Sequence, residues 1–97
     1  MKILITAYTP FGEDKFNSAN EVVKGLDLKG FDAEIEVCEL PVVYNPRIYE
    51  QILLDHKPDI FLLCGQAAGR NKITLEYHGL NLMYAKSPDN EGVVKLG

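Results

Sequence analysis

The chain has 97 residues, of which 46% are hydrophobic and 9% aromatic, a size that suits one domain or part of one. Ten basic residues against fourteen acidic ones give a net charge of −4 with no basic run, which argues against nucleic acid as a partner. No stretch approaches the roughly 18 consecutive apolar residues of a membrane span, and both cysteines lie in apolar runs typical of reduced thiols, so we expect a soluble cytoplasmic protein.

Strand and helix patterns alternate along the first two thirds of the chain. Residues 3–7 are almost continuously apolar, as in a parallel strand that is covered on both faces. Residues 19–26 have helical spacing, residues 33–43 alternate as in a half-buried strand, residues 45–56 are again helical, and residues 60–64 form a buried apolar run. The order β-α-β-α-β predicts an α/β fold with parallel strands and helical crossovers.

Capping residues mark the two predicted helices. Ser18 or Asn20 is available to cap the first helix, and Gly25 or Gly30 lies near its end. In the second helix, Asn45 is expected at the cap and Pro46 at the first helical position.

The next predicted strand, residues 73–83, breaks this rhythm. Too few residues separate it from the strand at 60–64 for a parallel crossover, so it should pair antiparallel or leave the sheet edge. On this strand Glu76 and His78 would share a face. The intervening loop, Gly65 to Arg70, follows the carboxyl end of a buried strand, where open α/β sheets bind ligands, so we expect the functional site there.

Several blocks of residues, taken together and in order, resemble a known family. They are Thr6-Ala7-Tyr8-Thr9-Pro10-Phe11-Gly12, Asn17, Leu40-Pro41-Val42-Val43, Lys57-Pro58-Asp59-Ile60, Gly65-Gln66-Ala67-Ala68-Gly69-Arg70, Glu76 and Ser87-Pro88-Asp89-Asn90-Glu91-Gly92. This set is similar to the amino-terminal half of pyroglutamyl peptidase I, the pyrrolidone-carboxylate peptidases.

The resemblance implies a fold and an activity. The fold would be a three-layer α/β/α sandwich with a mostly parallel mixed sheet, of which residues 1–97 would form a single partial domain, the amino-terminal half. The family's enzymes are cytoplasmic cysteine peptidases that remove an amino-terminal pyroglutamate from peptides with a Cys-His-Glu triad. The resemblance also implies a homo-oligomer, a dimer or tetramer. No cluster of His, Cys and Asp residues has metal-ligand spacing, so we expect no metal, and we expect no cofactor.

Glu76 matches the glutamate of that triad. In this role its carboxylate would accept a hydrogen bond from the catalytic imidazole, fix its tautomer and stabilise the imidazolium. The alternative is that Glu76 is solvated or paired with Arg70 or Lys72. The peptidase hypothesis requires that Glu76 face the mouth formed by Phe11 and Gln66.

The resemblance places further residues near the substrate. A pyroglutamate ring carries no ammonium charge, so its site can be neutral and apolar with aromatic walls. Phe11 matches one pocket phenylalanine, and Tyr8 takes the place of the other, with a hydroxyl that must find a partner. Asn17 matches an asparagine near the substrate, and Gln66 matches a position whose backbone N–H helps to hold the oxyanion. The alternatives are a core aromatic for Phe11, a helix-start residue for Asn17 and a plain loop residue for Gln66.

Two departures from the family bear on catalysis. Lys86 stands where the family has an arginine that helps to polarise the scissile carbonyl; lysine keeps the charge but loses the planar fork. The family's nucleophilic cysteine and its histidine match neither cysteine and neither histidine of this chain. We therefore expect a fragment or truncated reading frame without peptidase activity of its own. Such a fragment, with part of its sheet uncovered, is expected to self-associate or to be partly disordered beyond about residue 84.

Two other functions stay open at this point. Cys64, His78 and Glu76 could form a self-contained hydrolase, because the cysteine ends a buried strand and the other two residues lie on a nearby one. Alternatively, the glycine-containing loop from Gly65 to Arg70 could wrap a phosphate or nucleotide in a non-catalytic binding module, although it matches neither nucleotide fingerprint well.

Overall fold

The computed structural model describes residues 1–12, 14–67, 69–76, 84–85 and 89–96. Its main sheet has three parallel strands in the order β2-β1-β3: β1 (Lys2–Tyr8), β2 (Glu34–Leu40) and β3 (Ile60–Leu63). Helix α1 (Ser18–Lys24) connects β1 to β2, and helix α2 (Arg47–His56) connects β2 to β3. A separate antiparallel pair consists of β4 (Tyr84–Ala85) and β5 (Lys95–Leu96).

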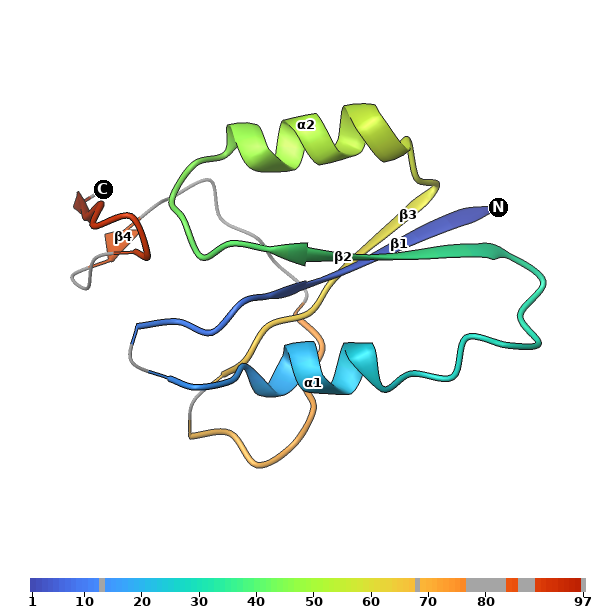
Figure 1. The fold of residues 1–97 in the computed structure, drawn as a ribbon, viewed down its shortest axis with the longest axis horizontal. Coiled ribbons are helices and arrows are strands. Elements are labelled where there is room, and N and C mark those ends of the chain that lie inside the picture. The colour runs from blue at the N-terminus through green and yellow to red at the C-terminus, as the bar shows by residue number, and fades with distance from the viewer. Residues whose placement is uncertain (13, 68, 77–83, 86–88, 97) are drawn as a thin grey trace.

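The strand order explains why the helices cover different faces. The chain moves from β1 to β2 in one direction and then back across β1 to β3 in the other. Right-handed crossovers in opposite directions place their helices on opposite faces of a sheet. Figure 1 shows this arrangement, with α1 and α2 on either side of the strands. The predicted α/β fold with parallel strands is confirmed.

The core lies along the central strand. Leu4 and Ala7 are completely buried and Ile5 is 7% exposed, as the continuous apolar run in β1 predicts. Val23 of α1 packs against Ile5 and Ala7. Leu40, the last residue of β2, is also buried. Helix α2 buries no residue completely, so it lies on the sheet with a half-buried face.

The helix boundaries differ in detail from the prediction. Asn17, and not Ser18 or Asn20, caps α1: its Oδ1 accepts a hydrogen bond from the Asn20 N–H at 3.1 Å. Gly25 ends this helix, which confirms one of the two predicted stops. The second helix begins at Arg47, one residue later than predicted, although the Asn45 side chain does accept a hydrogen bond from the Arg47 N–H.

The prediction of a strand over residues 73–83 is wrong for its first four residues. Residues 73–76 have no strand structure, and Ile73 and Leu75 are 94% and 80% exposed. A stable strand needs a partner strand and a buried face, and residues 73–76 have neither among the described residues, although their apolar and polar residues alternate. Residues 77–83, including His78, lie outside the described residues.

Candidate functional site

A pocket of about 290 Å³ lies at the carboxyl ends of the parallel strands. The connections that leave the neighbouring strands β1 and β2 run to α1 and α2 on opposite faces of the sheet, and such a switch point opens a crevice in α/β folds. Residues that follow all three strands line the pocket, together with one from α2: Tyr8, Phe11, Asn17, Val42, Val43, Tyr44, Tyr49, Gly65 and Gln66. None of these lining residues carries a carboxylate, ammonium or guanidinium group.

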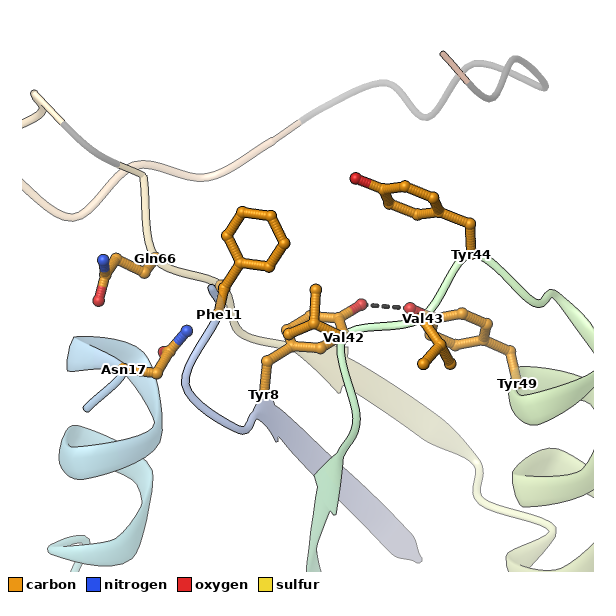
Figure 2. Close-up of a pocket in the computed structure, with 9 residues that line it drawn as sticks. Tyr8, Phe11, Asn17, Val42, Val43, Tyr44, Tyr49 and Gln66 are labelled. Atoms are coloured by element: carbon orange, nitrogen blue, oxygen red, sulfur yellow. Dashed lines mark hydrogen bonds between the residues drawn. The ribbon is translucent and has the colours of Figure 1, made fainter. Parts of the chain in front are cut away.

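Two tyrosines form one wall of the pocket. Figure 2 shows the hydroxyl groups of Tyr8, at the end of β1, and Tyr49, on α2, pointing toward one another and joined by a hydrogen bond. Burial raises the pKa of Tyr8 well above its usual value, and the Tyr49 hydroxyl raises it further. The Tyr8 hydroxyl thus has a hydrogen-bond partner, and it stays protonated at neutral pH.

Asn17 and Gln66 lie together at the start of α1. Gln66 Oε1 accepts a hydrogen bond from the Ser18 N–H at 2.7 Å, and Asn17, 8% exposed, caps the same helix. Each side chain therefore satisfies a backbone N–H of the first turn that has no partner within the helix. Asn17 thus has the role of a residue that begins a helix. The Gln66 side chain links the loop after β3 to the first turn of α1.

The turn at residues 89–93 folds back onto the pocket rim. Asp89 Oδ2 accepts a hydrogen bond from the Tyr44 N–H at 2.7 Å, and its Oδ1 accepts bonds from Glu91 and Val93. Burial raises the pKa of this carboxyl, but its backbone N–H partners outweigh burial and hold the pKa below its usual value. Asn90 binds the backbone on both sides of Phe11. The turn thereby joins the loops that follow β1 and β2.

Glu76 lies in a second, larger groove of about 900 Å³, which includes Gln66 and Cys64 but not Phe11. Its Oε1 accepts a hydrogen bond from Arg70 Nη1 at 2.7 Å, and the same nitrogen donates to Thr74 Oγ1. The Glu76 side chain is 72% exposed. The structure thus shows the Arg70 pair that the sequence left as an alternative. Glu76 and Gln66 line the same groove, but Glu76 does not line the pocket that contains Phe11, so the requirement that Glu76 face the mouth formed by Phe11 and Gln66 is not met in this structure.

The described residues give little support to a hydrolase built on Cys64. Burial raises the pKa of the Cys64 thiol, which disfavours the reactive thiolate. His56 Nδ1 donates its hydrogen bond to Glu36, at the far end of the sheet from the pocket. His78 lies outside the described residues, as does Lys86.

The loop after β3 does not form a typical phosphate cradle. Phosphate-binding loops lead into a helix whose N-terminal N–H groups face the anion. Residues 64–67 and 69–76 contain no helix. Within the described ranges, no group of three or more His, Cys, Asp or Glu side chains is placed to hold a metal ion. No helix in the described part of the chain is long and apolar enough to cross a membrane.

Some pocket residues were not identified from the sequence as site residues. Tyr44 and Tyr49 line the pocket, and Asn90 contacts the loop that carries Phe11 without lining the pocket itself. The spacing of apolar residues indicates which face of a helix a residue lies on. It does not indicate which distant loop that residue will contact. Val42 and Val43 did belong to the blocks that carry the family resemblance.

Comparison with known proteins gives a consistent result. A family model described as pyroglutamyl peptidase matches residues 1–97. Among relatives, the pyrrolidone-carboxylate peptidase of Lactobacillus johnsonii is 42% identical and that of Thermococcus kodakarensis 39% identical, over 100% and 95% of this chain. In each case the match covers 46% of the relative, so the chain spans less than half the length of these proteins.

Solved structures agree with the sequence matches. The pyrrolidone carboxyl peptidase of Pyrococcus furiosus superposes with a TM-score of 0.88 at 37% identity, over 99% of this chain and 48% of that one. Pyroglutamyl peptidase I of Bacillus amyloliquefaciens gives a TM-score of 0.87 at 36% identity, with the same coverage.

Proposed function

The chain belongs to the pyroglutamyl peptidase family, and on this premise we propose that its pocket takes the amino-terminal pyroglutamate of a peptide. The observation that carries the proposal is the uncharged lining of the pocket at the carboxyl ends of β1, β2 and β3. A pyroglutamate ring is a flat neutral lactam, whereas an ordinary amino terminus brings an ammonium ion that this lining would leave unpaired.

Each pocket group has a task in this proposal. Phe11 and Tyr8 supply aromatic surface for the faces of the ring. Asn17 lies beside the substrate, and the backbone N–H of Gln66 helps to hold the oxyanion of the tetrahedral intermediate. Lys86 supplies positive charge near the scissile carbonyl, as a point charge without the bidentate geometry of arginine.

Glu76 is proposed as the carboxylate of a Cys-His-Glu triad. In the family's reaction a cysteine thiolate attacks the carbonyl of the pyroglutamyl residue, the imidazole transfers the proton to the leaving amine, and the carboxylate orients the imidazole. This role requires the Glu76 side chain to leave Arg70 and to turn toward the pocket that contains Phe11. Because exposed ion pairs contribute only about 0–1 kcal/mol, the carboxylate can exchange Arg70 for an imidazole at small cost.

The 97 residues by themselves are proposed to be inactive as a peptidase. Neither Cys38 nor Cys64 matches the family's nucleophile, and the raised pKa of Cys64 keeps its thiol protonated. The two free thiols suit a protein of the reducing cytoplasm, which we propose as its location.

Binding can be tested without catalysis. We expect pyroglutamic acid amide to shift the backbone NMR resonances of Phe11, Tyr44 and Gly65 in the 97-residue chain. Prolinamide is the matched control, because it has the same ring size but carries a protonated amine. An equal response to both compounds, or no response to either, would contradict the proposed specificity of the pocket.

A second experiment separates this proposal from the self-contained hydrolase. The chain is incubated with a pyroglutamyl-coupled chromogenic substrate, and no turnover is expected. Turnover that disappears in Cys64→Ser would overturn the assignment and favour a hydrolase that uses Cys64 as its nucleophile.

A further inference from the structure

We propose that Asn90 is a positioning residue of the pocket, because its side-chain amide fixes the loop that carries Phe11. This inference rests on the proposed function of the pocket and names a residue that sets its shape. Asn90 itself does not line the pocket.

Three hydrogen bonds place Asn90 between two pocket loops. Its Nδ2 donates to the Pro10 carbonyl at 3.0 Å, and its Oδ1 accepts from the Gly12 N–H at 3.2 Å. Its backbone N–H donates to the Val42 carbonyl at 2.9 Å. Phe11 is the residue between Pro10 and Gly12, so the backbone is held on both sides of its ring, and the same residue anchors the loop after β2.

The chemistry of this contact suits an amide. One side chain must donate to a carbonyl and accept from an N–H of the same loop, and the amide of asparagine carries its donor and its acceptor on one carbon atom, close enough to reach both. Aspartate keeps the acceptor for Gly12 but places a carboxylate against the Pro10 carbonyl. Alanine removes both bonds.

The Phe11 loop depends on this outside support. Gly12 has a φ of 62°, in the left-handed region, and nothing lies within 4 Å of the position that a Cβ would occupy there. Within the described loop, the bond from the Asp14 N–H to the Phe11 carbonyl closes the turn locally. With few contacts of its own, the turn takes its position from the hydrogen bonds to Asn90. This contact is a long-range one, because Asn90 is separated from Gly12 by 78 positions in the sequence.

The turn that carries Asn90 is itself rigidly built. The Asp89 carboxylate, 7% exposed, collects the backbone N–H groups of Tyr44, Glu91 and Val93. These bonds hold the backbone of the turn in place, so the Asn90 side chain has a defined position from which it binds the backbone on both sides of Phe11.

The test compares Asn90→Ala and Asn90→Asp with the control Glu91→Ala. Glu91 is exposed and belongs to the same turn, and its bond to Asp89 uses the backbone N–H, which alanine keeps. Two quantities are measured on the 97-residue chain: hydrogen exchange of the Gly12 amide without ligand, and the Kd for pyroglutamic acid amide. Exchange of the Tyr44 amide reports whether the Asp89 turn stays intact.

Asn90→Ala is expected to raise Gly12 exchange and the Kd by about tenfold each, with Tyr44 exchange unchanged. Asn90→Asp should retain part of the Gly12 protection yet still weaken binding, because the Pro10 bond is lost. Glu91→Ala should stay within about twofold of wild type.

Other outcomes overturn the inference. Unchanged Gly12 exchange in Asn90→Ala would show that the loop is held by something else. Faster exchange with unchanged affinity would limit Asn90 to ordering the loop and would exclude a positioning role. If the wild-type chain fails to bind the amide, the proposed function fails, while Gly12 exchange still decides whether Asn90 fixes the loop.

Discussion

The hydroxyl of Tyr8 illustrates how one atom alters a pocket wall. A phenylalanine at this position would present a purely apolar ring, whereas Tyr8 adds a polar group that must be hydrogen-bonded when it is half-buried. Tyr49 supplies the bond from α2, so the wall keeps its flat aromatic surface and also links the sheet to a helix. The hydroxyl is accommodated because its partner lies in the same pocket.

The Tyr8 hydroxyl should make stability sensitive to high pH. Its pKa is raised in the folded state by burial and by Tyr49, so its contribution to stability is complete below about pH 10 and declines as the pH rises beyond that value. We expect Tyr8→Phe to show a smaller alkaline decline in the free energy of unfolding, measured by urea denaturation. Tyr49→Phe removes the neighbouring hydroxyl but leaves Tyr8 buried, so its decline should lie between the two. Identical pH curves for wild type and Tyr8→Phe would contradict this explanation.

Asn17 has a structural role that can be separated from a role in binding. Asn17→Ala removes the cap of α1 and should lower the free energy of unfolding by about 1 kcal/mol, whereas Asn17→Ser should restore most of that loss. Urea denaturation measures both, with the exposed Asn71→Ala as control. If Asn17 also touches the substrate, Asn17→Ser will recover stability but not affinity for pyroglutamic acid amide. Unchanged stability in Asn17→Ala would exclude the capping role.

At the scale of elements, a charged network joins three pieces of structure at the end of the sheet away from the pocket. Glu36 of β2 accepts hydrogen bonds from His56 at the end of α2 and forms a salt bridge of 3.1 Å with Lys2 of β1. Helix α2 buries no residue completely, and this polar contact adds to the apolar contacts that hold it on the sheet.

Because of this network, we expect the free energy of unfolding to fall at acidic pH. The bonds from His56 and Lys2 lower the pKa of Glu36, so its contribution is present above its ordinary value of 4.5 and is lost as the pH falls below that value. We expect Glu36→Gln to be less stable than wild type at neutral pH and to lose less stability on acidification, as followed by urea denaturation at a series of pH values. Glu34→Gln, an exposed position on the same face of β2, should behave as wild type. A parallel acid response in wild type and Glu36→Gln would refute the assignment.

The elements with strong local patterns were predictable, whereas long-range contacts were not. The buried run of β1 and the helix of residues 47–56 follow from periodicity, since the spacing of apolar residues directly reflects which face is covered. The alternation at residues 73–76 failed, because a strand also requires a partner, and the sequence does not say whether one is present.

The site shows the same division. Tyr8, Phe11, Asn17 and Gln66, which the sequence places at or after strand ends, line one pocket, and their role in substrate binding stays a prediction. It did not indicate that Asn90 folds back onto the Phe11 loop or that Tyr49 meets Tyr8, because both contacts join segments far apart in the chain. Such contacts depend on how whole loops return to the sheet.

At the scale of the whole molecule, the two edges of the sheet differ in character. On β2, Glu34, Glu36 and Glu39 place carboxylates along the edge. On β3, Ile60, Leu62 and Leu63 are each nearly half exposed, and the adjoining groove contains Val22, which is 59% exposed. Charges on an edge strand prevent pairing with other chains, whereas an apolar edge favours it.

The β3 edge is therefore expected to drive self-association of the 97-residue chain. Sedimentation velocity should show a weight-average mass that rises with protein concentration. Leu63→Lys should reduce this rise, because a lysine on an edge strand must be desolvated when a second chain pairs with it. Val37→Lys, on the charged β2 edge and 45% exposed in wild type, is the matched control and should associate like wild type. A compact monomer at all concentrations, with cooperative unfolding, would show that the β3 edge is protected by other means.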